Sequence, residues 1–275
     1  MLTEVLGLPS LETEYPVTAA EQAAYQKNGH ALLRQVCSQD EIALYHPAIG
    51  GATGRFNTEK RSLEERDTYG KAFLQVMNLW VRDEGVKKFV LARRFGKIAA
   101  DLMGVDAVRL YHDQALYKEA GGGPTPWHQD QFYWPLDTPN TITMWMPLVD
   151  VPVEKGALTF ASGSHVDGNL CGKEISDDSE KLIDQIVKER AFPVVVDGMK
   201  AGDATFHSGW TLHKAPANNT KSLREVMTII FFADGVPCAQ PKSKFQEADL
   251  AAWLPGCKPG DPAASPLNPV VYSRK

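Results

Sequence analysis

A histidine and an aspartate stand two residues apart in the segment PWHQDQFYW, residues 126–134. In an extended strand, residues i and i+2 point to the same face, so His128 and Asp130 could present an imidazole nitrogen and a carboxylate oxygen to one point. These are two of the three ligands of a 2-His-1-carboxylate site, which holds Fe(II) and leaves positions open for oxygen chemistry. Since an H-x-D pair also occurs by chance, the rest of the chain must supply the third ligand.

Two histidines late in the chain could complete such a site. The segment GDATFHSGWTLHKAP, residues 202–216, contains His207 and His213. The Gly-Asp pair at its start predicts a turn, after which a strand could fold back against the first motif. Position along the chain does not choose between the two histidines.

An arginine that would need an anionic partner follows His213 in the chain. Arg224 stands eleven residues after His213, at the head of the apolar strand predicted over 225–232. A charge beside such a strand is costly unless it has an anionic partner. A guanidinium pairs with a carboxylate through two parallel hydrogen bonds. Near an iron site, Arg224 is therefore suited to hold the far carboxylate of a dicarboxylic acid.

The composition excludes several classes of protein. The 275 residues are 43% hydrophobic and 23% charged, as in ordinary globular proteins, and the net charge is −5. Without a basic run, nucleic acid and anionic membranes are not expected partners. No apolar stretch approaches the roughly 20 residues that span a bilayer, and the first 16 residues lack the features of a signal peptide. The four scattered cysteines favour free thiols in a reducing cytoplasm.

The first hundred residues are expected to be mostly helical. Thr18 to Glu21 and Ser38 to Glu41 match the capping box that begins a helix. A short strand is predicted over 30–36, between these two helix starts. Residues 49–70 are predicted to begin as a loop and to continue as a charged segment. Helices are predicted again over 83–103.

Short strands separated by Gly and Pro turns are expected from about residue 105. They are predicted over 108–117, 141–146, 157–161, 192–196, 204–206 and 225–232, and a helix is inserted near 176–190. The chain lacks regular β-α-β alternation, a G-x-G-x-x-G motif and a P-loop. The expected class is α+β with a mainly β core shaped as a sandwich or barrel. We expect one domain over 1–275: a helical part to 104, the β core over 105–235 and a C-terminal tail over 236–275.

Together these segments resemble the phytanoyl-CoA dioxygenase family of Fe(II)- and 2-oxoglutarate-dependent oxygenases. The resemblance runs from about Ala115 to Phe232. It is carried by PWHQDQFYW, TITMWMPLVDV, EKGALTFASGSH and GDATFHSGWTLHKAPANNTKSLR. It implies a double-stranded β-helix, a cupin-like jelly roll, with the N-terminal helices packed on it. It further implies Fe(II), 2-oxoglutarate and O2 as cofactor and cosubstrates.

The resemblance also assigns roles to single residues. It implies that His128, Asp130 and His213 bind the metal and that Arg224 binds 2-oxoglutarate. Further residues expected to bind or lie near the cosubstrate are Trp134 and Thr143. One departure is Ala215, because related enzymes often have a serine there that binds the same carboxylate. The acid at position 130 implies hydroxylation or a related oxidation, since related halogenases have a small residue there.

The predicted function is oxidation of a small organic metabolite, with succinate and CO2 as coproducts. Two alternatives stay open: a cupin-like metalloenzyme that does not use 2-oxoglutarate, and a non-enzymatic metabolite-binding protein on the same fold. No basic cluster suits the phosphates of CoA, so a free, moderately apolar substrate is expected. Segments 49–75, 119–127, 166–175 and the tail are expected to line its pocket. A cytoplasmic monomer or small homo-oligomer is expected.

Overall fold

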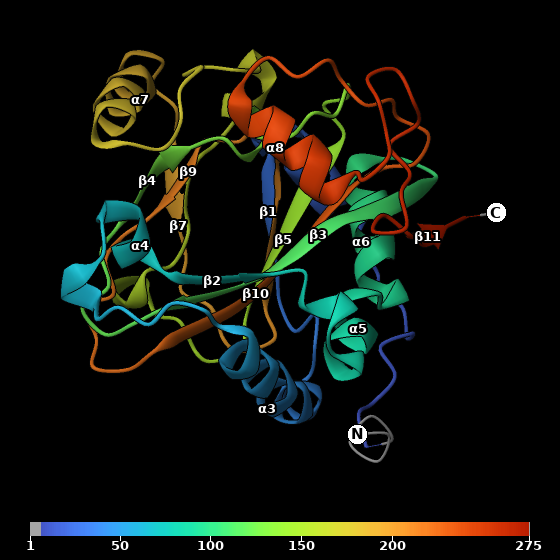
Figure 1. The fold of residues 1–275 in the computed structure, drawn as a ribbon, viewed down its shortest axis with the longest axis horizontal. Helices are drawn as coiled ribbons and strands as arrows, with labels where there is room; N and C mark the ends of the chain where they lie inside the picture. Colours follow the sequence, from blue (N-terminus) through green and yellow to red (C-terminus); the bar gives the residue numbers. More distant parts are fainter. Residues whose placement is uncertain (1–6, 275) are drawn as a thin grey trace.

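The computed structural model describes residues 7–274, apart from the side chains of residues 68 and 69. Two antiparallel sheets form its centre (Figure 1). The larger has the strand order β1-β8-β5-β10-β3-β11, and β2 also pairs with β3; the smaller has the order β4-β9-β6-β7. Strands of the larger sheet are β1 (His30–Leu33), β2 (Leu74–Met77), β3 (Ala107–Lys118), β5 (Thr141–Pro147), β8 (Ala204–Ser208), β10 (Arg224–Ala233) and β11 (Val270–Ser273). Strands of the smaller sheet are β4 (Thr125–His128), β6 (Thr159–Ala161), β7 (Val194–Val196) and β9 (His213–Ala215).

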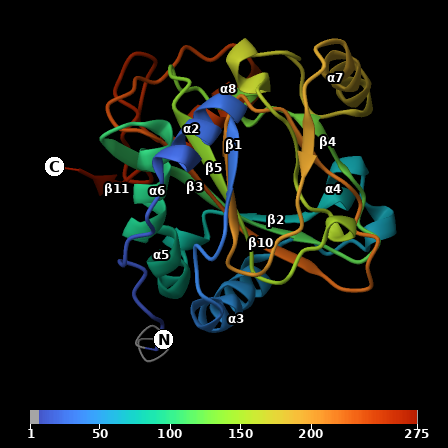
Figure 2. The same cartoon turned by 180° about the vertical axis from the view of Figure 1, so that it is seen from behind.

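Helices from the N-terminal part cover one face of the larger sheet (Figures 1 and 2). They are α2 (Ala19–Asn28), α3 (Gln39–Phe56), α5 (Glu84–Val90) and α6 (Arg93–Met103). Tyr45, Phe89 and Phe95 from three of these helices form a ring cluster with centroids 5.1 and 5.0 Å apart. The cluster belongs to the same apolar core as Met227 and Ile229 of β10. The packed helices therefore hold one face of the larger sheet in place.

Side chains of β10 point alternately toward the helices and toward a cavity on the opposite face of the larger sheet. Because side chains alternate along a strand, Met227 and Ile229 pack under the helices, whereas Arg224, Thr228 and Ile230 line the cavity. Facing this surface is the smaller sheet, which brings in the segments that contain the predicted metal ligands. The fold thus supplies a rigid wall for polar groups that converge between two sheets.

Most of the predicted elements are confirmed. Both capping boxes form, and the strands predicted after residue 105 appear within a few residues of their expected bounds. The predicted insert is α7 (Asp177–Glu189). The prediction that the first 16 residues lack the features of a signal peptide falls partly outside the described residues, because these begin at residue 7.

Two expectations about local structure were wrong or incomplete. The loop expected from residue 49 is helical, because α3 continues to Phe56. Its Ile49 and Ala52 are fully buried, so packing outweighs a glycine cost of about 1 kcal/mol per residue. The tail over 236–275 contains an unforeseen helix, α8 (Lys244–Trp253), and the strand β11. Three strands from outside 105–235, namely β1, β2 and β11, complete the larger sheet.

A short helix and several 3-10 turns complete the described chain. The helix α4 (Thr68–Ala72) follows the charged segment and precedes β2. No helix among residues 7–274 is both long enough and apolar enough to cross a membrane.

Candidate metal and cosubstrate site

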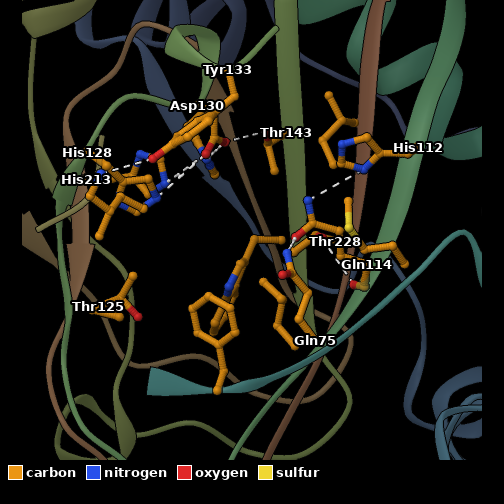
Figure 3. Close-up of a pocket in the computed structure, with 18 of the residues that line it drawn as sticks. Gln75, His112, Gln114, Thr125, His128, Asp130, Tyr133, Thr143, His213 and Thr228 are labelled. Carbon is orange, nitrogen blue, oxygen red and sulfur yellow. Dashed lines mark hydrogen bonds and ion pairs between the residues drawn. The ribbon is translucent and has the colours of Figure 1, made fainter. Parts of the chain in front are cut away.

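The two halves of the predicted metal site meet across the smaller sheet. His128 ends β4 and His213 begins β9, and the two residues are direct partners in the register. Gln129 keeps an extended backbone (φ −125°, ψ 120°), after which Asp130 begins a 3-10 turn. One ligand atom from each of His128, Asp130 and His213 lies within 4.8 Å of the others, and Figure 3 shows them converging. The expected i, i+2 geometry therefore holds, although the strand itself ends at His128.

Backbone carbonyls orient both histidines. The Nδ1 of His128 donates to the Pro126 carbonyl at 2.8 Å, and that of His213 donates to the Thr211 carbonyl at 3.0 Å. A carbonyl only accepts, so Nδ1 carries the proton and the lone pair stays on Nε2. The two Nε2 atoms lie 3.6 and 3.7 Å from Asp130 Oδ1. Burial lowers the pKa of each histidine to about 4. Both are therefore neutral at pH 7, as metal ligands must be.

The second oxygen of Asp130 is occupied by side chains. Oδ2 accepts a hydrogen bond from Thr143 Oγ1 at 3.0 Å and lies 3.4 Å from His207 Nε2. Thr143 and His207 are direct partners on β5 and β8. Burial alone raises the pKa of the Asp130 carboxyl, but His213 and the other nearby histidines hold it well below its usual range. The carboxylate is therefore ionised and has one oxygen facing the two ligand histidines.

His207, the rival candidate for the third ligand, lies behind this group. Its side chain is 1% exposed, and its ring centroid is 4.4 Å from that of His213. It reaches Asp130 Oδ2, on the side away from the oxygen that faces His128 and His213. The cluster of three candidate ligands does not include it. The geometry thus favours His213 as the third ligand and gives His207 a supporting position.

Replacing Thr143 with valine is expected to weaken Fe(II) binding by about 10–100-fold, the usual effect of losing an outer hydrogen-bond partner of a ligand. The valine keeps the shape but leaves Asp130 Oδ2 without its 3.0 Å donor. Titration with Fe(II) or Co(II) measures the effect. Thr228→Val is the matched control, because Thr228 also lines the cavity but donates to the Gln114 carbonyl. Equal affinities in the two variants would contradict the role given to Thr143.

Arg224 is a cation buried in the wall of the cavity. Its side chain is 2% exposed, its Nη1 donates to the Gly156 carbonyl at 2.8 Å, and its guanidinium lies 5.4 Å from the ring centre of Trp145. Its buried Nε has no hydrogen-bond partner, and no carboxylate in the described chain forms an ion pair with it. Burial lowers its pKa to about 9, so it is still charged at pH 7. An uncompensated charge of this kind is costly, and an anionic ligand would relieve the cost.

A second buried cation, Lys118, lies beside Arg224. The two residues are direct partners on β3 and β10. Lys118 Nζ donates to the carbonyls of Gly123 and, at 3.2 Å, Pro216. Burial, and then the charge of Arg224, lowers its pKa to about 6. At pH 7 Lys118 is therefore mostly neutral, and Arg224 supplies the positive charge at this end of the cavity.

The lowered pKa of Lys118 gives a stability test in the ligand-free protein. Between pH 6 and its ordinary pKa of 10.5, the folded state binds fewer protons at this residue than the unfolded state. Stability therefore rises with pH over this interval, by up to about 1.4 kcal/mol per unit from this group, and the full penalty applies below pH 6. The gain in stability from Lys118→Met should thus shrink as pH rises from 6.5 to 8.5. Urea unfolding measures it; a pH-independent difference would contradict the buried neutral lysine.

A cavity of about 510 Å³ joins the metal candidates to Arg224. Trp134 lines it and packs against Tyr111 with ring centroids 5.6 Å apart. Ala215 lines it too, so the position of the missing serine does face the cavity. The segments expected to line the pocket supply the following residues: Phe73, Gln75, Thr125, Glu174, Ile175, Phe245 and Asp249. Thr143 and Trp134 are thus placed in the cavity wall, and their contact with a cosubstrate stays a prediction.

Comparison with known proteins identifies the family. The model of the phytanoyl-CoA dioxygenase family matches residues 25–226. The chain belongs to this family. It is 22% identical over 235 residues, 78% of each chain, to a probable alpha-ketoglutarate-dependent hypophosphite dioxygenase of Stutzerimonas stutzeri.

Solved structures of the family's class share the fold. The chain is similar to the non-haem alpha-ketoglutarate-dependent carbocyclase SnoK from nogalamycin biosynthesis, with 25% identity, a TM-score of 0.76 and coverage of 97% of this chain and 100% of SnoK. It is also similar to the epimerase SnoN in complex with Fe3+, alpha-ketoglutarate and nogalamycin RO, with 26% identity, a TM-score of 0.73 and coverage of 92% and 98%. The predicted jelly roll is confirmed by these matches.

The class of enzyme follows from the family and its relatives. The chain is a non-haem iron, 2-oxoglutarate-dependent oxygenase, and a His-Asp-His group suited to iron is present in its cavity. The two alternatives, a cupin that does not use 2-oxoglutarate and a non-enzymatic binding protein, lose their support. Alpha-ketoglutarate in the names of the relatives is the same compound as 2-oxoglutarate.

Proposed function

We propose that this protein hydroxylates, or otherwise oxidises, a small organic molecule at Fe(II) held by His128, Asp130 and His213, with 2-oxoglutarate held by Arg224. One observation carries the proposal: a buried arginine that pairs with no carboxylate of residues 7–274 lies in the same cavity as three converging metal-ligand side chains. When bound, Fe(II) and 2-oxoglutarate supply the oxidising chemistry, consuming O2 and releasing succinate and CO2.

The histidines are held ready for the metal before it binds. Hydrogen bonds to the carbonyls of Pro126 and Thr211 fix both rings with Nε2 toward the site. Asp130 offers Oδ1 on the same side, while Thr143 holds Oδ2. This preorganisation lowers the entropy lost on binding and supports a site with one carboxylate oxygen bound.

Arg224 and the walls around it are suited to hold a dicarboxylate. The guanidinium is fixed by the Gly156 carbonyl and by the face of Trp145, which leaves its remaining donors for a ligand. The low-dielectric surroundings strengthen an ion pair formed there. Trp134, on the cavity wall, is proposed to exclude water near the cosubstrate. Thr143 is proposed to serve the metal through Asp130 and to border the cosubstrate as well.

The carboxylate at position 130 favours oxygenation over halogenation. With metal bound, Asp130 would be the third protein ligand and would leave no place for a halide there. Its neighbours Thr143 and His207 support an ionised Asp130. We therefore propose hydroxylation, desaturation or a related oxidation as the outcome.

We further propose that residues 1–275 work as one oxygenase domain, a monomer or small homo-oligomer in the cytoplasm. Strands β1, β2 and β11, from the two ends of the chain, complete the sheet that carries Arg224, which supports a single unit. All four cysteines are free thiols, which fits a reducing compartment.

Release of succinate tests the proposal. Purified protein with Fe(II), 2-oxoglutarate and O2 should release succinate slowly without substrate, and faster when a substrate screen finds a match. Release must depend on Fe(II) and disappear under anaerobic conditions. Failure of the protein to bind or convert 2-oxoglutarate would refute the proposal and would revive the alternative of a metalloenzyme that does not use it.

A further inference from the structure

The end of the cavity away from Arg224 is where a substrate would lie. Arg224 and Ile230 are six residues apart on β10, which is about 20 Å along a strand. Thr143, whose hydroxyl holds Asp130, pairs with Ile230. A cosubstrate that reaches from Arg224 to the metal candidates therefore fills the Arg224 side. The space beyond them remains, and we call it the outer end.

Four segments that are separated in the sequence form the outer end. Figure 1 shows α8 crossing the ends of β1, β5 and β3, with α7 farther to the upper left. Cavity-lining residues at this end are His112, Tyr133, Glu174, Ile175, Phe245 and Asp249. The rings of Tyr133 and Phe245 lie edge to face, with centroids 5.6 Å apart. The Tyr133 hydroxyl accepts a hydrogen bond from the backbone of Ile175 at 3.0 Å, which ties the loop before α7 to this wall.

Asp249 is the carboxylate that α8 brings to the outer end. Its Oδ2 accepts a hydrogen bond from the Tyr111 hydroxyl at 2.9 Å, which fixes the side chain against β3. His112, the next residue of β3, packs on Trp253 of α8 at 5.2 Å between ring centres. Burial raises the pKa of Asp249 to about 6, which fits a carboxyl kept from water. The proposed oxidation has no task for this group.

The two ends of the cavity differ in the charge of their ionisable side chains. Within the described chain, Arg224 is the only lysine or arginine among the cavity-lining residues, and 2-oxoglutarate would neutralise it. The ionisable acids at the outer end are Asp249 and Glu174. An anionic substrate, such as the hypophosphite named for one relative, would meet no lysine or arginine there among residues 7–274. His112 adds no charge at pH 7, because burial lowers its pKa to about 3. A cation would meet a carboxylate and aromatic faces, both of which attract it.

We propose that the substrate carries a protonated amine, received by Asp249, on a ring that lies against Tyr133 and Phe245. This inference rests on the proposed function, because it places the substrate beyond the metal ligands. A cavity of about 510 Å³ accommodates 2-oxoglutarate together with a molecule of one or a few rings. The amine anchors the substrate and the ring fills the apolar wall, so the carbon to be oxidised is held toward the metal site.

Two sets of matched probes test the charge preference. The first is 2-phenylethylamine, 2-phenylethanol and phenylacetate; the second is tryptamine, tryptophol and indole-3-acetate. Each set keeps one ring and changes the charge from positive to neutral to negative. Calorimetry under anaerobic conditions measures binding to protein loaded with Co(II) and 2-oxoglutarate. We expect the dissociation constant of each amine to be at least about tenfold lower than that of its alcohol, which is the effect of one hydrogen bond to a charged group. The acids should bind most weakly.

Asp249→Asn should reduce the amine preference to within about twofold. Asparagine still offers an oxygen to Tyr111, so a carboxylate that only tethers α8 would leave the preference unchanged. Glu247→Gln is the matched control, because Glu247 is exposed on the same helix and does not line the cavity. It should bind the probes as the wild type does.

The inference is overturned if the alcohols or acids bind as tightly as the amines, if neither amine binds, or if Asp249→Asn keeps the preference. The order of affinities of the amine, alcohol and acid for the wild-type protein tests the inference even if a variant fails to fold. Binding of 2-oxoglutarate, measured first in the same preparation, separates the two claims. Its failure would refute the proposed function, whereas its success without an amine preference would refute this inference alone.

Discussion

His213→Ala is expected to abolish high-affinity Fe(II) binding, while His207→Ala is expected to weaken it only moderately. Both histidines are buried, and both lie within 4 Å of Asp130. His213 faces Oδ1 together with His128, whereas His207 faces Oδ2 beside Thr143. Losing an outer hydrogen-bond partner of a ligand typically weakens metal binding by roughly 10–100-fold. The loss of Fe(II) affinity should be larger than this in His213→Ala and should stay within this range in His207→Ala.

The pair of variants is its own control. Each substitution removes one buried imidazole from the same cluster, so a general effect of packing would appear in both. Metal titration of apo protein gives the affinities, and thermal unfolding confirms that each variant is folded. If His207→Ala loses Fe(II) and His213→Ala retains it, the third ligand has been assigned to the wrong histidine.

Arg224→Leu is expected to weaken 2-oxoglutarate binding by two orders of magnitude or more and to leave Fe(II) affinity within about tenfold. Removing one partner of a buried ion pair costs about 2–5 kcal/mol of binding free energy. The ligand-free variant should nevertheless be as stable as the wild type or more stable, because leucine removes a buried cation that has no anionic partner among the described residues. Weaker 2-oxoglutarate binding together with unchanged folding stability would indicate that Arg224 serves ligand binding and not the fold.

Arg109→Leu is the matched control for this variant. Arg109 also lies on the larger sheet, but it pairs with Asp234 and does not line the cavity. It should bind 2-oxoglutarate as the wild type does. An unchanged dissociation constant in Arg224→Leu, measured by calorimetry with Co(II) present, would remove the central support for the proposed cosubstrate site.

The sequence predicts the site where residue type and spacing are sufficient evidence. His128 and Asp130 follow from strand periodicity, and Arg224 follows from the cost of a charge beside an apolar strand. The contacts of Thr143 and His207 with Asp130 were not predicted. They depend on the register of β5 against β8, which no local pattern encodes.

The outer end of the cavity shows where sequence reasoning stops. Asp249 and Phe245 lie on α8, in a segment predicted only as a tail, and no motif marks them. They reach the cavity because Tyr111 and Trp253 dock the helix on β3. The prediction of a loop from residue 49 was wrong for a related reason. The buried side chains of Ile49 and Ala52 stabilise α3 despite its glycines. Tertiary packing decided both cases.

Anaerobic addition of Fe(II) and 2-oxoglutarate tests the central claim most directly. Wild-type protein should develop the visible charge-transfer band that arises when 2-oxoglutarate is bound to Fe(II). The band should be absent in His213→Ala, and in Arg224→Leu it should require far more 2-oxoglutarate. A wild-type protein that shows no band at saturating concentrations, or a band that persists unchanged in His213→Ala, would contradict the account.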